Sequence, residues 1–490
     1  MTKNSNKNSK TCRTGIKGLD QILHGGLPEH SLYSIQGEPG TGKTTFALQF
    51  LIEGLRHKEP GLYITFSETK AELERVASSH GWDISQIKIM DLSSLEDQFD
   101  PSAQTSLFHP FEVELKEVFK LVLDKIDEVK PDRIVFDSVS EMRLLAETPL
   151  RYRRQILALK QALANRKITV LFLDDLTVGT QDLQIHSIAH GVVHLSRIQH
   201  EYGAERRKIK VIKLRGVDFV GGYHDMDIAT GGIQVYPRML SAQHSKESAP
   251  GSVSSDNEAF DLMLGGGLDR GTANLFVGPA GSGKSNIILR YAMSAIAKGE
   301  KVAYFCFDET LANFMKRAKG LSVPVEKPIK DGLLRLQKVD PAELAPGAFA
   351  HLILNLVCEE DYKVIIIDSL NGYIQAMPQE SFLTLQLHEL LAFLNNQGVL
   401  TIMSLAQAGI FGNMVSPVDL TYLADTVLLT RFFEYDGEVR KAISVVKKRT
   451  GFHEKTIREF SFDSSGLYMG PELREFEGVL TGVARQKSKG

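Results

Sequence analysis

The sequence contains few cysteines and no long apolar segment. Its three cysteines, Cys12, Cys306 and Cys358, lie far apart and form no C-x-x-C pair, which argues against a disulfide framework and a cysteine zinc site. It has no apolar run of about 18 residues, the length that a membrane helix needs, and its polar N-terminus lacks a signal-peptide core. The net charge of −3 provides no bulk attraction to nucleic acid or to an acidic membrane. We therefore expect a cytoplasmic protein with no membrane or nucleic-acid partner.

The chain contains an internal repeat. Two motifs of the form G-x-x-x-x-G-K-[ST], GEPGTGKT at 37–44 and GPAGSGKS at 278–285, lie 241 positions apart. The same shift aligns the two GGL triplets and places YITFSET on YFCFDET, and further along RIVFDSVS matches VIIIDSLN and VIKLRG matches VVKKRT. Motifs that recur in one order predict a tandem duplication.

Each copy alternates short, apolar, β-branched runs with longer amphipathic stretches. Uninterrupted apolar strands separated by helices predict an α/β fold with a mainly parallel sheet flanked by helices. At 490 residues the chain is too long for a single core, and a Ser-rich segment joins the copies. We predict a disordered tail over 1–13, domains over 14–240 and 257–482, a linker over 241–256 and a short tail over 483–490.

The two glycine-rich motifs predict phosphate binding. Closely spaced glycines let backbone N–H groups converge on phosphate at a helix N-terminus. Lys43 and Lys284 would reach the β- and γ-phosphates, and Thr44 and Ser285 would hold Mg²⁺. We therefore expect ATP and Mg²⁺ as cofactors. The predicted ATP contacts in the loops are Gly37, Gly40, Thr41, Gly42, Lys43, Thr44 and Thr45, and Gly278, Gly281, Ser282, Gly283, Lys284, Ser285 and Asn286.

Carboxylates follow two apolar strands in each copy. Asp137 and Asp368 each end a strand, where a carboxylate can hold Mg²⁺ or cap the following turn. Glu68, and Asp308 with Glu309, end another strand at the same offset from each loop, and a carboxylate there can take a proton from an attacking water or hydroxyl. The predicted catalytic residues are Glu68, Asp308 and Glu309. The predicted metal ligands are Thr44, Asp137, Ser285, Asp308 and Asp368.

Near the end of each copy, two cations occupy positions i and i+2. Lys213 with Arg215, and Lys447 with Arg449, would lie on one face of a strand and form a fork suited to phosphate. If the forks serve a neighbouring subunit's nucleotide, the protein must form a ring. Alternatively, they are the exposed charges of an edge strand.

Together these motifs resemble the KaiC family of double-domain ATPases and autokinases, from about residue 14 to about residue 482. The resemblance implies two RecA-like domains, a homo-hexamer of two stacked rings with ATP between subunits, hydrolysis in the first ring and autophosphorylation in the second. It also implies a KaiB-like protein partner. It extends the expected ATP contacts to Ser79, Leu214, Lys441 and Lys448 in addition to the forks.

The sequence departs from the family pattern at three places. The first copy has Ser67-Glu68 where the family has two glutamates, whereas the second retains Asp308-Glu309. The family's phosphorylated Ser-Thr pair falls on Thr421 and Tyr422, with Ser416 nearby. These hydroxyls are the expected phosphorylation sites, although they can also simply pack near a subunit boundary. The long C-terminal peptide that meets KaiA is absent, so we expect no KaiA binding.

The leading functional hypothesis is a Mg-ATP-dependent hexameric ATPase with serine/threonine autokinase and autophosphatase activity, acting in signalling or circadian-type timing. One alternative is a nucleic-acid-dependent ATPase of the RecA, RadA or DnaB kind, which the duplication and the lack of a basic, aromatic loop disfavour. Another is an ATP-gated signalling scaffold without kinase activity.

Overall fold

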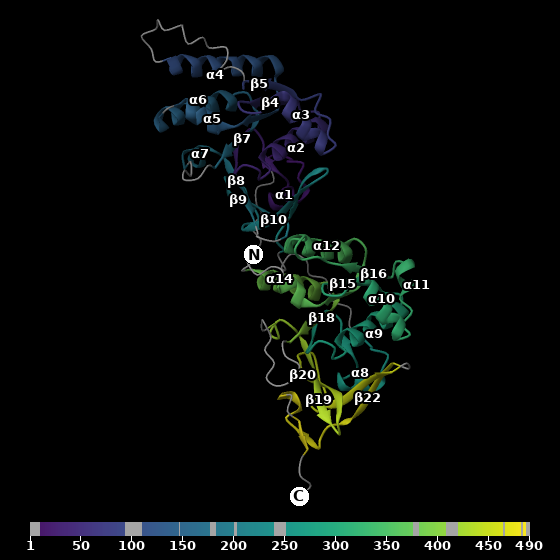
Figure 1. Ribbon diagram of the computed structural model, residues 1–490. Coiled ribbons are helices and arrows are strands. Elements are labelled where there is room, and N and C mark those ends of the chain that lie inside the picture. The colour runs from purple at the N-terminus through teal and green to yellow at the C-terminus, as the bar shows by residue number, and fades with distance from the viewer. Residues whose placement is uncertain are drawn as a thin grey trace. The chain divides into compact units, whose positions relative to one another are not determined.

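The computed structural model describes residues 10–93, 110–146, 148–176, 183–199, 203–239, 251–375, 382–407, 420–463, 466–481 and 484–486 (Figure 1). The chain divides into two compact units, Met1–Arg238 and Met239–Gly490. Among these described residues, none of the helices combines the length and the apolar character needed to span a membrane.

The first unit is built on a nine-stranded sheet in the order β11-β10-β9-β8-β3-β7-β6-β4-β5. The six strands from β8 to β5 are parallel, and β9, β10 and β11 extend the sheet as antiparallel hairpins. The strands are β3 Leu32–Gly37, β4 Gly61–Thr65, β5 Lys88–Asp91, β6 Arg133–Asp137, β7 Thr169–Asp175, β8 Gly191–Ile198, β9 Arg206–Leu214, β10 Tyr223–Ala229 and β11 Gly232–Tyr236, and a small ribbon pairs β1 Thr11–Cys12 with β2 Leu27–Pro28.

Helices cover both faces of this sheet (Figure 1). They are α1 Lys17–Ile22, α2 Lys43–Arg56, α3 Lys70–Ser79, α4 Pro110–Val129, α5 Val139–Leu145, α6 Pro149–Ala164 and α7 Leu183–Ile188. Successive strand residues point to opposite faces, so in β6 Val135 packs with α2 in one core while Ile134 and Phe136 pack with α6 in the other. The continuous apolar runs of the sequence are therefore strands buried on both faces.

The second unit repeats this topology in the order β16-β15-β17-β18-β14-β19-β20-β21-β22. Its six strands from β16 to β19 are parallel, and β20, β21 and β22 are antiparallel. The strands are β14 Ala273–Gly278, β15 Lys301–Cys306, β16 Leu334–Lys338, β17 Tyr362–Asp368, β18 Leu400–Ala406, β19 Thr426–Tyr435, β20 Glu438–Lys448, β21 Arg458–Asp463 and β22 Gly466–Glu472. Two ribbons pair β12 Ser252–Val253 with β13 Leu268–Asp269 and β23 Phe476–Glu477 with β24 Arg485–Gln486.

The helices of the second unit also cover both faces of its sheet. They are α8 Glu258–Met263, α9 Lys284–Ala297, α10 Leu311–Gly320, α11 Glu326–Lys330, α12 Pro346–Cys358, α13 Leu370–Gln375, α14 Leu383–Asn396 and the 3₁₀ turn Val479–Thr481. In β17, Val364 and Ile366 pack with α9 and α10, and Ile365 and Ile367 pack with α12 and α14.

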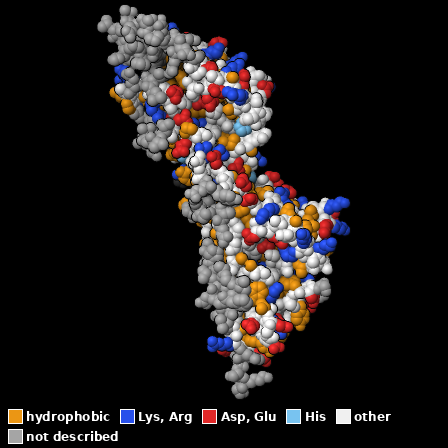
Figure 2. All heavy atoms as spheres, in the orientation of Figure 1, with side chains coloured by type: hydrophobic (Ala, Val, Ile, Leu, Met, Phe, Trp, Pro, Cys, Tyr) orange, Lys and Arg blue, Asp and Glu red, His pale blue; other side chains and the backbone are white. Residues whose placement is uncertain are grey.

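The predicted α/β fold is confirmed: each unit is a mainly parallel sheet between helices, and the order of strands is the same in both. The exact domain boundaries stay predictions. On the face shown in Figure 2, acidic and basic side chains are interspersed, as the small net charge leads one to expect.

Candidate active sites at the two phosphate loops

Each glycine-rich motif joins a buried strand to a helix. The first connects β3 to α2 and the second connects β14 to α9. The residue before each helix, Gly42 or Gly283, has a φ of 100° or 101°. This left-handed conformation favours glycine, and a Cβ at Gly42 would lie 2.5 Å from Ile228. The loop geometry predicted from the motif is therefore present in both units.

The lysine of each motif lies buried under its own loop. Lys43 Nζ donates to the carbonyls of Gly37 and Glu38 at 2.9 and 3.0 Å and lies 2.5 Å from Asp175. Lys284 Nζ donates to Gly278 and Pro279 at 2.9 and 2.8 Å. Burial lowers the pKa of Lys284 to about 8, although the charge of Asp368 opposes the effect.

In the first unit, strand order brings Glu68 and Asp137 to the loop. Because β4 lies beside β6, Tyr63 donates a hydrogen bond to Asp137. The backbone N–H of Glu68 donates to Thr65 Oγ1 at 2.9 Å, and a capping box that begins at Thr69 starts α3 immediately afterwards. These contacts fix the Glu68 side chain beside the loop, where Thr44 Oγ1 donates to its Oε1 at 3.4 Å.

The environment of Glu68 disfavours its charge. Burial, and then the nearby Asp137 carboxylate, raise the pKa of Glu68 to about 7. Its Oε2 atom is buried and has no hydrogen-bond partner among the described residues. Burial also raises the pKa of Asp137, against the hydrogen bond from Tyr63. A carboxylate with a pKa near neutrality and an open oxygen is suited to accept a proton.

In the second unit, Asp368 occupies the position of Asp137. It accepts a hydrogen bond from Tyr304 at 2.6 Å and another from Ser404. Tyr304 is the counterpart of Tyr63, so each strand-end aspartate is oriented by a tyrosine from the neighbouring strand. The peptide bond after each aspartate, to Ser138 or Ser369, is cis.

The acidic pair of the second unit has partners that Glu68 lacks. Arg317 donates to both oxygens of Glu309, from Nε at 3.2 Å and from Nη2 at 2.8 Å. Asp308 is exposed and accepts a hydrogen bond from Ser369. β15 ends at Cys306, so both residues lie in the segment that follows it, and Glu309 is bound within an ion pair. Its role as a proton acceptor stays a prediction.

The first fork differs from its predicted position. β9 ends at Leu214, so Arg215 follows the strand. Lys213 Nζ donates to the carbonyls of His186 and Ala189, and Arg215 Nη2 donates to that of Ser187. Cations commonly satisfy the last carbonyls of a helix in this way, and α7 ends here. Within one chain, the first fork therefore holds the end of α7.

The second fork holds the predicted phosphorylation segment. Lys447 Nζ donates to the carbonyls of Thr421 and Ala424 at 2.9 and 2.7 Å, and Arg449 donates to that of Tyr422 at 3.0 Å. Thr421 and Tyr422 form part of an exposed turn before β19. Ser416 lies outside the described residues.

The remaining predicted ATP contacts lie on elements other than the phosphate loops. Ser79 ends α3 and donates to Val76, and Leu214 is buried at the end of β9. Lys441 is paired with Phe432 and Phe460 within the sheet. Lys448 bonds residues of its own unit. Its Nζ donates to the carbonyl of Leu264 at 2.6 Å and lies 3.2 Å from the carboxylate of Asp269.

Sequence reasoning missed several side chains at these sites. They are Tyr63 and Tyr304, Asp175 beside Lys43, and Arg317 beside Glu309. It also missed a buried network of the first unit, in which Gln36 and Arg143 both donate to Asp174. Aligning the two copies would have drawn attention to Arg317, because the first copy has Val76 at that position.

The residues present fit Mg²⁺ and a nucleoside triphosphate. Each unit combines a left-handed glycine turn, a buried lysine, a hydroxyl after the lysine and a strand-end aspartate. In the described part of the chain, no three His, Cys, Asp or Glu side chains form a metal cage. Proteins usually hold Mg²⁺ through one or two carboxylates together with phosphate oxygens and water, and each unit offers a strand-end aspartate of this kind.

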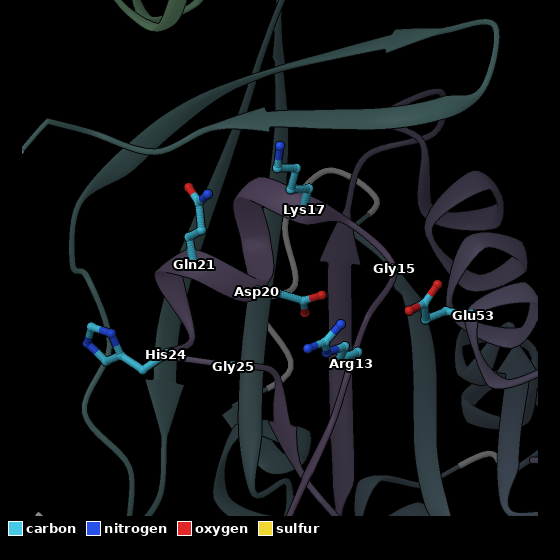
Figure 3. A pocket seen from close by; sticks show the side chains of 8 residues that line it. All are labelled: Arg13, Gly15, Lys17, Asp20, Gln21, His24, Gly25 and Glu53. Atoms are coloured by element: carbon cyan, nitrogen blue, oxygen red, sulfur yellow. The ribbon is translucent and has the colours of Figure 1, made fainter. Parts of the chain in front are cut away.

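A hollow of about 450 Å³ lies elsewhere in the first unit (Figure 3). It is lined by the segment before β2 and by Glu53 of α2, and it includes no residue of the phosphate loop. Neither Glu68 nor Asp137 is among its lining residues. We do not assign the active site to this hollow.

The comparisons with known proteins agree with this geometry. The family model described as "ATPase: KaiC" matches residues 12–239 and again residues 253–474. The chain is 27% identical to the circadian clock oscillator protein KaiC of Parathermosynechococcus lividus, over 96% of this chain and 87% of that protein. It is 26% identical to the protein of the same name from a Picosynechococcus strain, over 97% of this chain and 92% of that one. Because the family model covers nearly the whole chain in two copies, the protein belongs to the KaiC family of ATPases.

Proposed function

We propose that this KaiC-family ATPase binds Mg-ATP at both phosphate loops and hydrolyses it mainly in the first unit, with Glu68 as the general base. The observation that carries the proposal is the position of Glu68 beside Thr44, with its pKa raised to about 7 by burial. At neutral pH, such a carboxylate can take a proton from the attacking water while part of it is ionised. Lys43 would neutralise phosphate charge, and Thr44 with Asp137 would hold Mg²⁺.

In the second unit, the corresponding residues are Lys284, Ser285 and Asp368. We propose that this unit transfers the γ-phosphoryl group to Thr421 in a homo-hexamer, with the exposed Asp308 as the carboxylate nearest to an incoming hydroxyl. The exposure of the Thr421 turn supports this proposal, since a hydroxyl must be accessible to reach a neighbouring subunit's nucleotide. A phosphate there would add a charge of about −1.5 to −2, close to Lys447 and Arg449. The phosphorylated state would act in signalling or circadian-type timing; the relatives are named circadian clock oscillator proteins.

The proposal is tested with the purified full-length chain and Mg-ATP. We expect ADP release that requires Mg²⁺, and a hexamer by multi-angle light scattering when ATP is present. Lys43→Ala should lower ADP release more than Lys284→Ala does. A chain that neither assembles nor releases ADP would contradict the proposed function.

A further inference from the structure

In the second unit, one arginine joins the acidic pair to the phosphate loop. Arg317 of α10 donates to both oxygens of Glu309, and its Nη1 donates to Asn286 Oδ1 at 3.2 Å. Asn286 directly follows the loop residue Ser285. We propose that Arg317 is a positioning residue that withholds Glu309 from water activation, so that the second unit retains ATP for phosphoryl transfer instead of hydrolysing it.

The first unit lacks this arrangement although its backbone is equivalent. The positions of Arg317 and Asn286 are occupied by Val76 and Thr45. Val76 packs against the apolar core beside α2. Glu68 therefore has no arginine partner in this position, and its Oε2 is unpartnered within the described residues. The two copies therefore differ in the surroundings of the carboxylate, Glu68 or Glu309, that could take a proton from water.

Arg317 is held firmly in place. Its side chain is 21% exposed and that of Glu309 is 29% exposed, so the pair is shielded from most solvent. The guanidinium also lies 4.9 Å from the ring centre of Phe314. Burial opposes the charge of Arg317, but the hydrogen bonds to Glu309 and the nearby Tyr304 and Asp368 raise its pKa overall. The arginine consequently stays charged, and the bidentate geometry fixes Glu309.

This arrangement changes the chemistry available at the second loop. In hydrolysis, a water oxygen forms a bond to the γ-phosphorus, the bond from that phosphorus to the bridging oxygen of ADP breaks, and the water's proton passes to a carboxylate. Both oxygens of Glu309 already accept N–H donors from Arg317, so a water molecule would have to compete with the guanidinium for this carboxylate. A hydroxyl acceptor can still reach the exposed Asp308. This inference rests on the proposed function, because it concerns the fate of ATP at the same site.

The test replaces Arg317 with the residue of the first copy. In the full-length Lys43→Ala background, ADP release reports on the second loop. We expect Arg317→Val to increase the rate of ADP release at least about tenfold. A general base typically accelerates such a reaction on the order of a hundredfold or more, and the expected gain is a part of that acceleration.

Lys316→Ala is the matched control, since Lys316 is exposed on the same helix and lies outside the ion pair. It should leave the rate of ADP release unchanged. Arg317→Lys should give an intermediate rate, because lysine keeps the charge without the two-pronged geometry. Adding Glu309→Gln to Arg317→Val should abolish the gain, which separates a freed base from general loosening of α10.

If Arg317→Val leaves the rate of ADP release unchanged, while Lys284→Ala abolishes ADP release in this background, the inference is wrong and the proposed function stands. An unaltered chain with no ADP release at either loop would overturn both.

Discussion

Replacing Glu68 by glutamine is expected to lower activity and raise stability at the same time. The substitution keeps the shape of the side chain and its hydrogen bond with Thr44, but it removes the charge. Raising the pKa of a carboxyl group from 4.5 to about 7 corresponds to about 3 kcal/mol against its ionised form. Because Glu68 is only partly buried, solvent screening reduces the cost to about 1–2 kcal/mol.

The sign of the effect depends on pH. The folded protein binds more protons at Glu68 than the unfolded chain between pH 4.5 and about 7, so the ionised carboxyl reduces stability as the pH rises through this window. Below the window, Glu68 is protonated in both states and the cost disappears. Glu68→Gln should therefore be more stable than the unaltered chain at pH 8 and nearly equal to it at pH 4.5.

The assay combines thermal unfolding without nucleotide and ATP turnover. A gain of about 1–2 kcal/mol raises the melting temperature of a unit of this size by about 2–8 °C at pH 8. Turnover by the first unit, measured in the Lys284→Ala background, should fall about a hundredfold or more. Thr69→Ala is a useful control, because it removes the cap of α3 and should lower stability at every pH. A Glu68→Gln variant that is less stable at pH 8, or that retains full turnover, would refute the reasoning.

Three further predictions concern other residues. Arg133→Ala should lower the free energy of unfolding by about 3–5 kcal/mol, because it removes a buried arginine that donates hydrogen bonds to Glu59 and to two backbone carbonyls. In the same denaturant titration, replacing the exposed Arg56 by alanine should change the free energy of unfolding by less than about 1 kcal/mol. ATP affinity in the Lys43→Ala background should weaken as the pH rises through 8, where Lys284 loses its charge; a flat titration from pH 7 to 9 would contradict this. Mass spectrometry after incubation with Mg-ATP should find phosphate mainly on Thr421 and none in Lys284→Ala, and its absence from Thr421, Tyr422 and Ser416 would leave an ATPase without kinase activity.

The repeat made the fold predictable from the sequence. Apolar strands followed by helical stretches indicated buried parallel sheets. The two phosphate-loop motifs indicated at which end of its strands each sheet would bind a nucleotide. The positions of Asp137 and Asp368 at strand ends follow from the same pattern. These features depend on local spacing, which a sequence displays directly.

Side-chain partners were not predictable in the same way. Tyr63 reaches Asp137 because β4 lies beside β6, although the two residues are distant in the chain. The forks were predicted as phosphate ligands or as exposed charges of an edge strand, and the sequence did not indicate that the carbonyls at the end of α7 and in the Thr421 turn accept their hydrogen bonds. Arg317 bonds Glu309, which lies just before α10, and also Asn286 of α9. Such contacts follow from tertiary arrangement, which local spacing does not determine.

The central claim is that the two phosphate loops divide their work, and steady-state ADP release from two matched variants of the full-length chain tests it most directly. Lys43→Ala and Lys284→Ala remove the same contact from the first and the second loop respectively. With equal protein concentration and saturating Mg-ATP at pH 7.5, we predict that Lys284→Ala retains most of the ADP release and that Lys43→Ala loses most of it. Equal losses in the two variants, or the larger loss in Lys284→Ala, would contradict the claim.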